Sequence, residues 1–274
     1  MNELRLIDRR AYFVCATQRS GSTLLCELLK ATGVAGRPGE FFEQLRSTGM
    51  PRQGRQYFEG IADQAAIGHL PPVDPGRPEQ PGEFERLIRG IVASQSSANG
   101  VFAAKLMWNY MDDFRARLRL LPGLADAPAG TAIRSVFSDP QFIYVTREDK
   151  VAQAVSLWKA IQTQQWRDEG GVGKSPRAIY SFAALDHLVC ELEAWELEWE
   201  RWFEQSGVDP IRVVYERLSA SRVETIERVL LELGLEVPER DLTVSPLMRR
   251  QADESSEEWA RRYLDESTAT VIDA

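Results

Sequence analysis

Residues 12–33 read YFVCATQRSGSTLLCELLKATG, and this stretch decides the fold. It begins with the apolar run 12–16, which is typical of a buried parallel strand. A polar turn follows, and then leucines at helical spacing up to Gly33, a residue that favours a helix end. The order strand, tight turn and helix is the first half of a βαβ unit and predicts a fold of the α/β class.

The turn at residues 17–23 has the composition of an anion site. A helix start offers unpaired backbone N–H groups and the positive end of the helix dipole, and Gly21 lets a ligand approach the backbone closely. Arg19 adds a full charge, and Ser20, Ser22 and Thr23 add hydroxyl donors. The Gly-Lys pair of the nucleotide-triphosphate loop is missing, which favours a diphosphate-like ligand. These residues alone leave open that the hydroxyls only cap the helix.

The rest of the chain alternates apolar runs with helical patterns. Further strands are expected at 101–104, 142–146 and 211–215, with helices at 149–165, 185–202 and 223–233. We therefore predict a three-layer, P-loop-like fold whose central parallel sheet carries helices on both faces. Residues 1–274 are expected to form one domain, in which a Pro- and Gly-rich insertion of loops and short helices at about 44–98 covers the binding edge of the sheet.

Composition excludes several classes of protein. Three cysteines without a C-x-x-C pair, and two histidines far apart in the sequence, argue against a disulfide framework and against a metal site. A net charge of −8 disfavours non-specific nucleic-acid binding. No apolar run has the length of a signal peptide or a membrane span, so we expect a cytoplasmic protein.

A second anion-binding position follows the strand expected at 142–146. Arg147 stands at the carboxyl end of that strand, where open α/β sheets bind ligands, and Ser156 lies two to three turns into the next helix. Together the two side chains would clamp one more phosphate. Spacing alone equally allows a surface arginine and a helix-interior serine.

Several segments, in matching order over nearly the whole chain, make the sequence similar to one family. They are the turn, the T-R-x-D-K-V-x-Q-A-V-S-x-W segment at 146–158, V-A-G-R-P-G-E-F-F at 34–42, K-L-M-W-N at 105–109 and R-Q-A-D at 250–253. The chain resembles the Stf0 family of bacterial sulfotransferases, which use 3'-phosphoadenosine 5'-phosphosulfate (PAPS). The resemblance implies a PAPS donor, PAP as the product, no metal, and a homodimer.

The resemblance also assigns donor-site residues. The residues Arg19, Ser20, Gly21, Ser22 and Thr23 would surround the 5'-phosphosulfate, while Arg147 and Ser156 match the family's 3'-phosphate clamp. Three further residues are expected near the nucleotide: Tyr215, Arg249 and Arg250. For Arg249 and Arg250, a solvated charge pair is the alternative.

Sulfuryl transfer to an alcohol needs a base, and no histidine lies near these motifs. A carboxylate is the substitute, and the resemblance places the general base at Glu40, with Glu43 as the fallback. Flanking Phe41 and Phe42 would partly desolvate Glu40. Lys105 is a candidate for contacting the transferring sulfuryl group, with an ordinary strand-end lysine as the alternative.

The acceptor is expected to be a saccharide, either trehalose or a related glycan or glycolipid. By resemblance Gln18 contacts the sugar, and Arg37, Arg52 and Tyr57 fall in segments that line the sugar pocket. These three depart from the pattern of trehalose-sulfating members, and the extra arginines indicate an anionic acceptor or a larger glycan. Two rival functions remain: a nucleotide-dependent phosphotransferase, which the missing Gly-Lys pair disfavours, and a non-catalytic module that binds a nucleotide or a glycan.

Overall fold

A computed structural model describes residues 9–61, 63–166, 178–239 and 254–272. The chain forms two compact units that are interleaved along the sequence. The sheet unit comprises the described parts of Met1–Pro51, Pro75–Glu148 and Trp195–Val244. The helical unit comprises those of Arg52–Asp74, Asp149–Ala194 and Ser245–Ala274.

The sheet unit is built on four parallel strands in the order β2-β1-β3-β4. In chain order its elements are β1 Ala11–Ala16, α1 Ser22–Thr32, α2 Glu83–Gln95, β2 Phe102–Met107, η3 Trp108–Tyr110, α3 Met111–Leu118, α4 Ala129–Phe137, β3 Gln141–Thr146, β4 Ile211–Val214, α7 Tyr215–Ala220 and α8 Arg222–Glu232. β1 is buried at every position, as expected for a central parallel strand. The predicted parallel sheet is confirmed, but β2 runs three residues further than expected, so that Lys105 lies inside the strand and not at its end.

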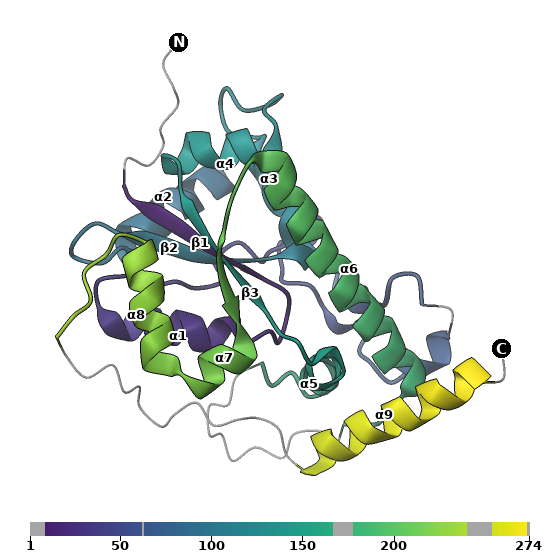
Figure 1. Cartoon of the computed structure of the whole chain (residues 1–274). Helices are drawn as coiled ribbons and strands as arrows, with labels where there is room; N and C mark the ends of the chain where they lie inside the picture. The colour runs from purple at the N-terminus through teal and green to yellow at the C-terminus, as the bar shows by residue number, and fades with distance from the viewer. Residues whose placement is uncertain (1–8, 62, 167–177, 240–253, 273–274) are drawn as a thin grey trace. The chain divides into compact units, whose positions relative to one another are not determined.

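Helices cover both faces of this sheet, as predicted (Figure 1). On one face Phe13 of β1 packs against Phe114 of α3 and Phe137 of α4. Because side chains alternate across a strand, the neighbouring Tyr12 points to the other face, where its hydroxyl donates to the Ala35 carbonyl just after α1 (2.6 Å). Helices α3 and α4 were not predicted from apolar periodicity. Their aromatic contacts with β1 hold them on this face of the sheet.

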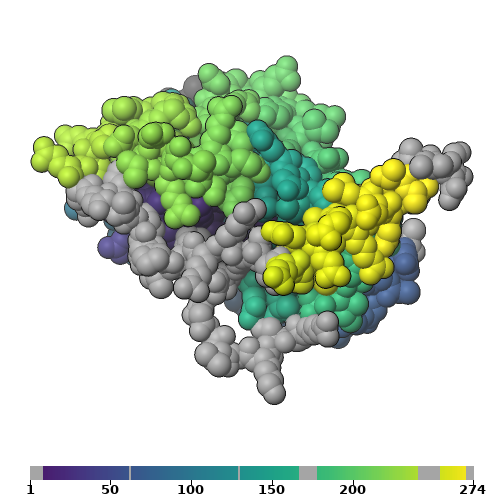
Figure 2. Space-filling model, turned by 60° about the horizontal axis from the view of Figure 1, so that its bottom comes forward, coloured from purple at the N-terminus to yellow at the C-terminus, as the bar shows by residue number. Residues whose placement is uncertain are grey.

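The helical unit contains η1 Gly54–Phe58, η2 Gln64–Ile67, α5 Lys150–Thr163 and α9 Glu254–Ile272. The long helix α6, Phe182–Ser206, contributes its first half to this unit and its second half to the sheet unit. Lys159 of α5 donates to Ser256 Oγ of α9 (2.8 Å) and lies 4.9 Å from the Trp259 ring. Figure 2 shows α9 as a yellow surface helix, whose polar sequence explains why no apolar pattern predicted it.

Candidate functional site

The turn predicted to bind an anion lies between β1 and α1. Helix α1 begins at Ser22, and its N-cap is Gly21 in the left-handed region (φ 88°) with no side-chain capping hydrogen bond. The alternative that serine and threonine hydroxyls cap the helix is therefore wrong. Ser20 is fully buried, and its Oγ has no hydrogen-bond partner among the described residues. A buried hydroxyl without a partner costs free energy, which a ligand oxygen placed there would recover.

Two arginines converge on this turn from neighbouring strands. Arg19 lies in the turn itself, and Arg147 follows β3 and donates from its guanidinium to the Arg19 carbonyl (3.3 Å). Burial, and then the charge of Arg147, lower the pKa of Arg19 to about 10, so the side chain stays cationic at neutral pH. β1 and β3 are adjacent, and chain connections leave them in opposite directions along the sheet. Such a switch point is where open α/β sheets bind ligands.

Tyr215 closes the turn from the end of β4. Its ring lies 4.9 Å beneath the Arg147 guanidinium, a cation–π distance. The same ring lies against Gly21, where an added Cβ would stand 2.3 Å from Tyr215 Cδ2. The close approach and the positive φ both require glycine at this position. Tyr215 thus shapes the turn as well as standing beside it.

Replacing Gly21 by alanine should therefore damage both stability and anion binding. A left-handed non-glycine residue costs about 1–2 kcal/mol, and displacing the Tyr215 ring adds to that cost. We expect Gly21→Ala to lower Tm by at least about 4 °C and to weaken PAP binding in calorimetry. Gly100→Ala is the matched control, because Gly100 also has a positive φ (82°) but nothing within 4 Å of its added Cβ. Equal effects of the two variants would show that the Tyr215 ring can move aside for the added Cβ without loss of stability.

Glu40 and Lys105 form the second part of the site. Lys105 Nζ lies 2.7 Å from Glu40 Oε2 and 3.3 Å from Thr23 Oγ1. The side chain of Lys105 is 7% exposed and that of Glu40 is 20% exposed, so the ion pair is largely withdrawn from solvent. One ammonium group therefore joins the carboxylate to the anion-binding turn.

The backbone around Glu40 is fixed on both sides. The Lys105 backbone N–H donates to the Gly39 carbonyl (2.7 Å) along the outer edge of β2. On the other side, the buried Arg117 donates to the Phe42 carbonyl (3.3 Å). Phe42 itself packs in the core with Phe114 (5.0 Å between ring centroids). Phe42 therefore anchors this segment in the core, and the partial desolvation of Glu40 by Phe41 and Phe42 stays a prediction.

Tyr110 is a residue that the sequence did not point to. Its hydroxyl donates to the Lys105 carbonyl (3.2 Å). Burial first, and then the charge of Glu40, raise the pKa of Tyr110 well above its ordinary value. The tyrosine therefore stays protonated beside the Glu40–Lys105 pair. Its position directly after the conspicuous 105–109 stretch was the only signal that could have found it.

Trp108 and Arg115 were also missed. Trp108 directly follows β2 at the carboxyl edge of the sheet and stacks edge-to-face on Trp199 (5.0 Å). The Arg115 guanidinium lies 5.2 Å from the Trp108 ring. Trp199 Nε1 donates to the Ala16 carbonyl (2.9 Å), two residues before the buried Gln18. The half-buried indole thus stands at the same edge of the sheet as Gln18.

Other predicted residues lie elsewhere. Arg37 is exposed, and Phe41 and Glu43 are half-buried next to Glu40 in sequence. Arg249 and Arg250 lie outside the described residues.

The helical unit contains three more predicted residues: Ser156, Arg52 and Tyr57. Ser156 is half-buried on α5. Arg52 donates to the Gln56 carbonyl (2.8 Å), and Tyr57 stacks on Trp166 (6.2 Å).

Two kinds of feature are absent from the described residues. No group of three or more His, Cys, Asp or Glu side chains there could hold a metal ion. Within the same part of the chain, no helix combines the length and the apolar character that crossing a membrane requires.

Comparisons with known proteins agree on one family. Residues 11–266 match the family model described as Stf0 sulphotransferase. The chain is 40% identical over 261 residues to trehalose 2-sulfotransferase of Mycobacterium tuberculosis (strain ATCC 35801 / TMC 107 / Erdman), covering 94% of this chain and 96% of that one. It is 41% identical to trehalose 2-sulfotransferase of Mycolicibacterium smegmatis (strain ATCC 700084 / mc(2)155), covering 92% and 94% of the two chains.

One solved sulfotransferase domain has a lower sequence identity than these two relatives. The sulfotransferase domain of the Synechococcus PCC 7002 olefin synthase is 14% identical with a TM-score of 0.44, over 95% of this chain and 96% of that chain. The family model and the two curated relatives each span almost the whole length. The chain therefore belongs to the Stf0 sulphotransferase family.

Proposed function

We propose that this protein transfers the sulfuryl group of PAPS to a hydroxyl of a saccharide, with Glu40 as the general base. One observation carries the proposal: Lys105 Nζ contacts both the Glu40 carboxylate and the Thr23 hydroxyl of the anion-binding turn. The arrangement places a proton acceptor, a cation and an anion site next to one another. Family membership and relatives called trehalose 2-sulfotransferase support a sugar acceptor.

The donor would be held by the turn. Its fit rests on the buried Ser20 hydroxyl without a partner, on the close-packed Gly21 and on the two cations Arg19 and Arg147. Arginine suits the fork of oxygens on a phosphate or sulfate. The residue proposed to complete the 3'-phosphate clamp, Ser156, belongs to the helical unit and stays a prediction.

The chemistry then divides between Glu40 and Lys105. Glu40 takes the proton of the acceptor hydroxyl as the oxygen–sulfur bond to the acceptor forms. The bond between sulfur and the phosphate oxygen breaks, and PAP leaves with the additional negative charge. Lys105, adjacent to Thr23, stabilises that developing charge. Positioning of the two substrates supplies much of the rate, as in phosphoryl transfer.

The acceptor would lie at the carboxyl edge of β1 and β2. Gln18 offers an amide for sugar hydroxyls, and the half-buried Trp108 indole offers an apolar surface of the kind that packs on a sugar ring. Arg37 is exposed and available to a larger or charged acceptor. From the family resemblance we also propose a homodimer, to be measured by light scattering.

Mass spectrometry tests the function directly. The protein is incubated with PAPS and with trehalose, glucose, anionic sugars and glycolipids, and a sulfate mass increment is expected on at least one saccharide. Calorimetry with PAP and with ATP–magnesium separates this function from a phosphotransferase. Binding of ATP without binding of PAP would reject the proposal, and so would sulfation of no saccharide.

A further inference from the structure

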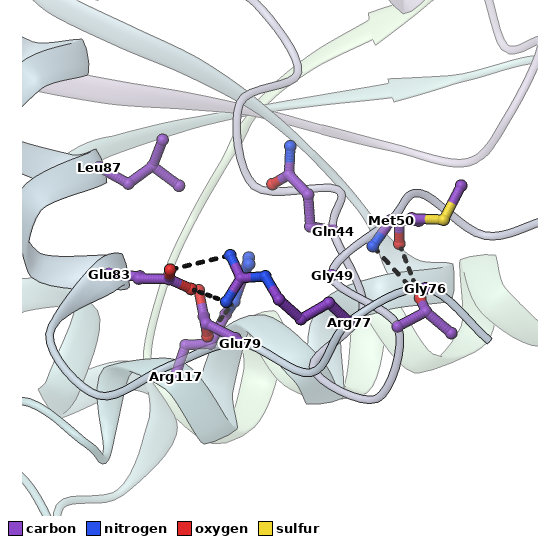
Figure 3. A pocket seen from close by; sticks show the side chains of 10 residues that line it. Gln44, Gly49, Met50, Gly76, Arg77, Glu79, Glu83, Leu87 and Arg117 are labelled. Atoms are coloured by element: carbon purple, nitrogen blue, oxygen red, sulfur yellow. Dashed lines mark hydrogen bonds and ion pairs between the residues drawn. The ribbon is translucent and has the colours of Figure 1, made fainter.

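The sheet unit contains a pocket that the proposed chemistry does not use. It measures about 510 Å³ and lies between the chain stretches 44–50 and 76–87, with one wall from α3 (Figure 3). The 44–50 stretch follows Glu40 directly in sequence. Gln44 lies four residues after Glu40, which limits the distance between their Cα atoms to about 14 Å. The pocket therefore adjoins the segment that carries the proposed base.

Two ion pairs supply most of its polar lining. Arg117 is 2% exposed, and its Nε lies 2.9 Å from Glu79 Oε2. Arg77 binds both carboxylate oxygens of Glu83 (2.9 and 3.4 Å). Figure 3 shows both pairs on one side of the pocket. With two guanidinium groups and two carboxylates, this lining has no net charge, which disfavours an anionic ligand and suits a neutral one with many hydroxyl groups.

Gln44 adds a hydrogen-bond acceptor, its amide oxygen, to the lining of the pocket. Its Oε1 is buried and has no hydrogen-bond partner among the described residues. Figure 3 shows the Gln44 side chain above the Arg77–Glu83 pair, at the level of Leu87. Leu87 and Met50 provide apolar surface in the same pocket. Hydrogen-bonding groups combined with apolar surface match a sugar ring, which carries hydroxyls at its rim and C–H groups on its faces.

Hydrogen bonds tie together the chain stretches that surround the pocket. The Arg77 backbone N–H donates to the Thr48 carbonyl (2.8 Å), and the Met50 backbone N–H donates to the Thr48 hydroxyl oxygen (3.2 Å). Arg117 connects the pocket to the Phe42 carbonyl, two residues from Glu40. A ligand in the pocket would therefore be held at a fixed distance from the base, which is what positioning of an acceptor requires.

We propose that this pocket is a second saccharide subsite, which takes the part of a glycan acceptor beyond the sugar that is sulfated. The inference rests on the proposed transfer to a saccharide and deepens it. Of the two acceptors that the extra arginines indicated, the uncharged balance of this lining favours the larger glycan over the anionic one.

Kinetics with acceptors of different length test the subsite. We expect Arg77→Ala and Gln44→Leu each to lower kcat/KM for trehalose and maltotriose about tenfold, the effect of one lost hydrogen bond to a charged or buried group. The value for glucose should stay within twofold of wild type, because one sugar occupies only the reacting position. Arg89→Ala is the matched control: Arg89 forms an exposed ion pair with Glu85 on α2 that does not line the pocket. Equal losses for all acceptors, or no loss for the longer ones, would overturn the subsite.

Direct binding separates failure of the subsite from failure of the function. Saturation-transfer NMR with maltotriose, without PAPS, should give a signal with wild type that is clearly weaker with Gln44→Leu and unchanged with Arg89→Ala. If wild type transfers sulfate to no saccharide but this pattern holds, the proposed function fails, while the pocket stands as a saccharide-binding site. If maltotriose gives no signal with wild type, or the same signal with Gln44→Leu, the subsite is rejected whatever the enzyme transfers. Arg77 is exposed, so its variant should fold, which thermal unfolding checks.

Discussion

Glu40→Gln should lower kcat for sulfuryl transfer by about 10²–10⁴-fold, the range for removal of a general base. Glutamine keeps the volume of the side chain, and its amide oxygen still accepts a hydrogen bond from Lys105 Nζ, now 2.7 Å from Glu40 Oε2. It takes no proton from the acceptor hydroxyl, however. Since Glu40 is not among the residues proposed to hold the donor, PAP affinity should stay within about threefold of wild type. Transfer rates at saturating acceptor and calorimetry with PAP measure the two effects.

Glu43→Gln is the control for this experiment. Glu43 is a half-buried carboxylate three residues further along the same segment and was the fallback for the base. We expect its variant to keep turnover within about twofold. If Glu43→Gln loses turnover and Glu40→Gln does not, the base is Glu43, and the contact between Lys105 and Glu40 is structural.

Arg19→Met should weaken PAP binding about 30-fold or more. The guanidinium is the charge that the turn itself supplies, and losing one partner of a buried, hydrogen-bonded charge pair costs about 2–5 kcal/mol. Each 1.4 kcal/mol is tenfold in affinity. Methionine fills a similar volume without the charge, so the loss reports on electrostatics and not on a cavity. Calorimetric titration with PAP at two salt concentrations is the measurement.

The same variant should leave the unliganded protein as stable as wild type or make it more stable. Burial and the neighbouring Arg147 lower the pKa of Arg19 to about 10, below its value in the unfolded chain. The folded state therefore holds this proton less tightly, and the group destabilises the fold while it is charged. That cost is full below about pH 10 and declines as the pH rises from about 10 towards the ordinary pKa of arginine. Thermal unfolding at neutral pH checks the sign, with exposed Arg217→Met of α7 as the control. A large drop in Tm for Arg19→Met alone would show that Arg19 is structural.

Apolar runs predicted the strands because a parallel strand is buried on both faces. The runs 12–16 and 142–146 lie within β1 and β3 as expected. Gly33 ends α1 in the left-handed region, as its residue type indicated. Helix α9 was not predicted, because its sequence is mostly polar and charged and shows no apolar periodicity. Only a few of its residues, such as Tyr263, contact α6.

The site was predictable where it is local in sequence. The residues of the turn at 17–23 are consecutive in the sequence, so their types alone indicate that the turn binds an anion. The contact of Glu40 with Lys105 was not predictable, because it depends on Gly39 running along the edge of β2. Nor did any local pattern indicate that Arg117, on a short helix, would be buried against Glu79. Pairings between distant segments are fixed by tertiary packing, which single-sequence patterns do not encode.

The order β2-β1-β3-β4 also has a kinetic consequence. β1 pairs with strands that begin at Phe102 and Gln141, so its neighbours arrive only after long stretches of chain have been synthesised. Non-local parallel pairing forms slowly, because closing the long loops costs entropy before the stabilising contacts between the strands exist. The donor turn, Lys105, Arg147 and Tyr215 meet only when all four strands are in place. PAP should therefore not bind before all four strands are paired. The appearance of PAP binding during refolding would then report when the sheet is complete.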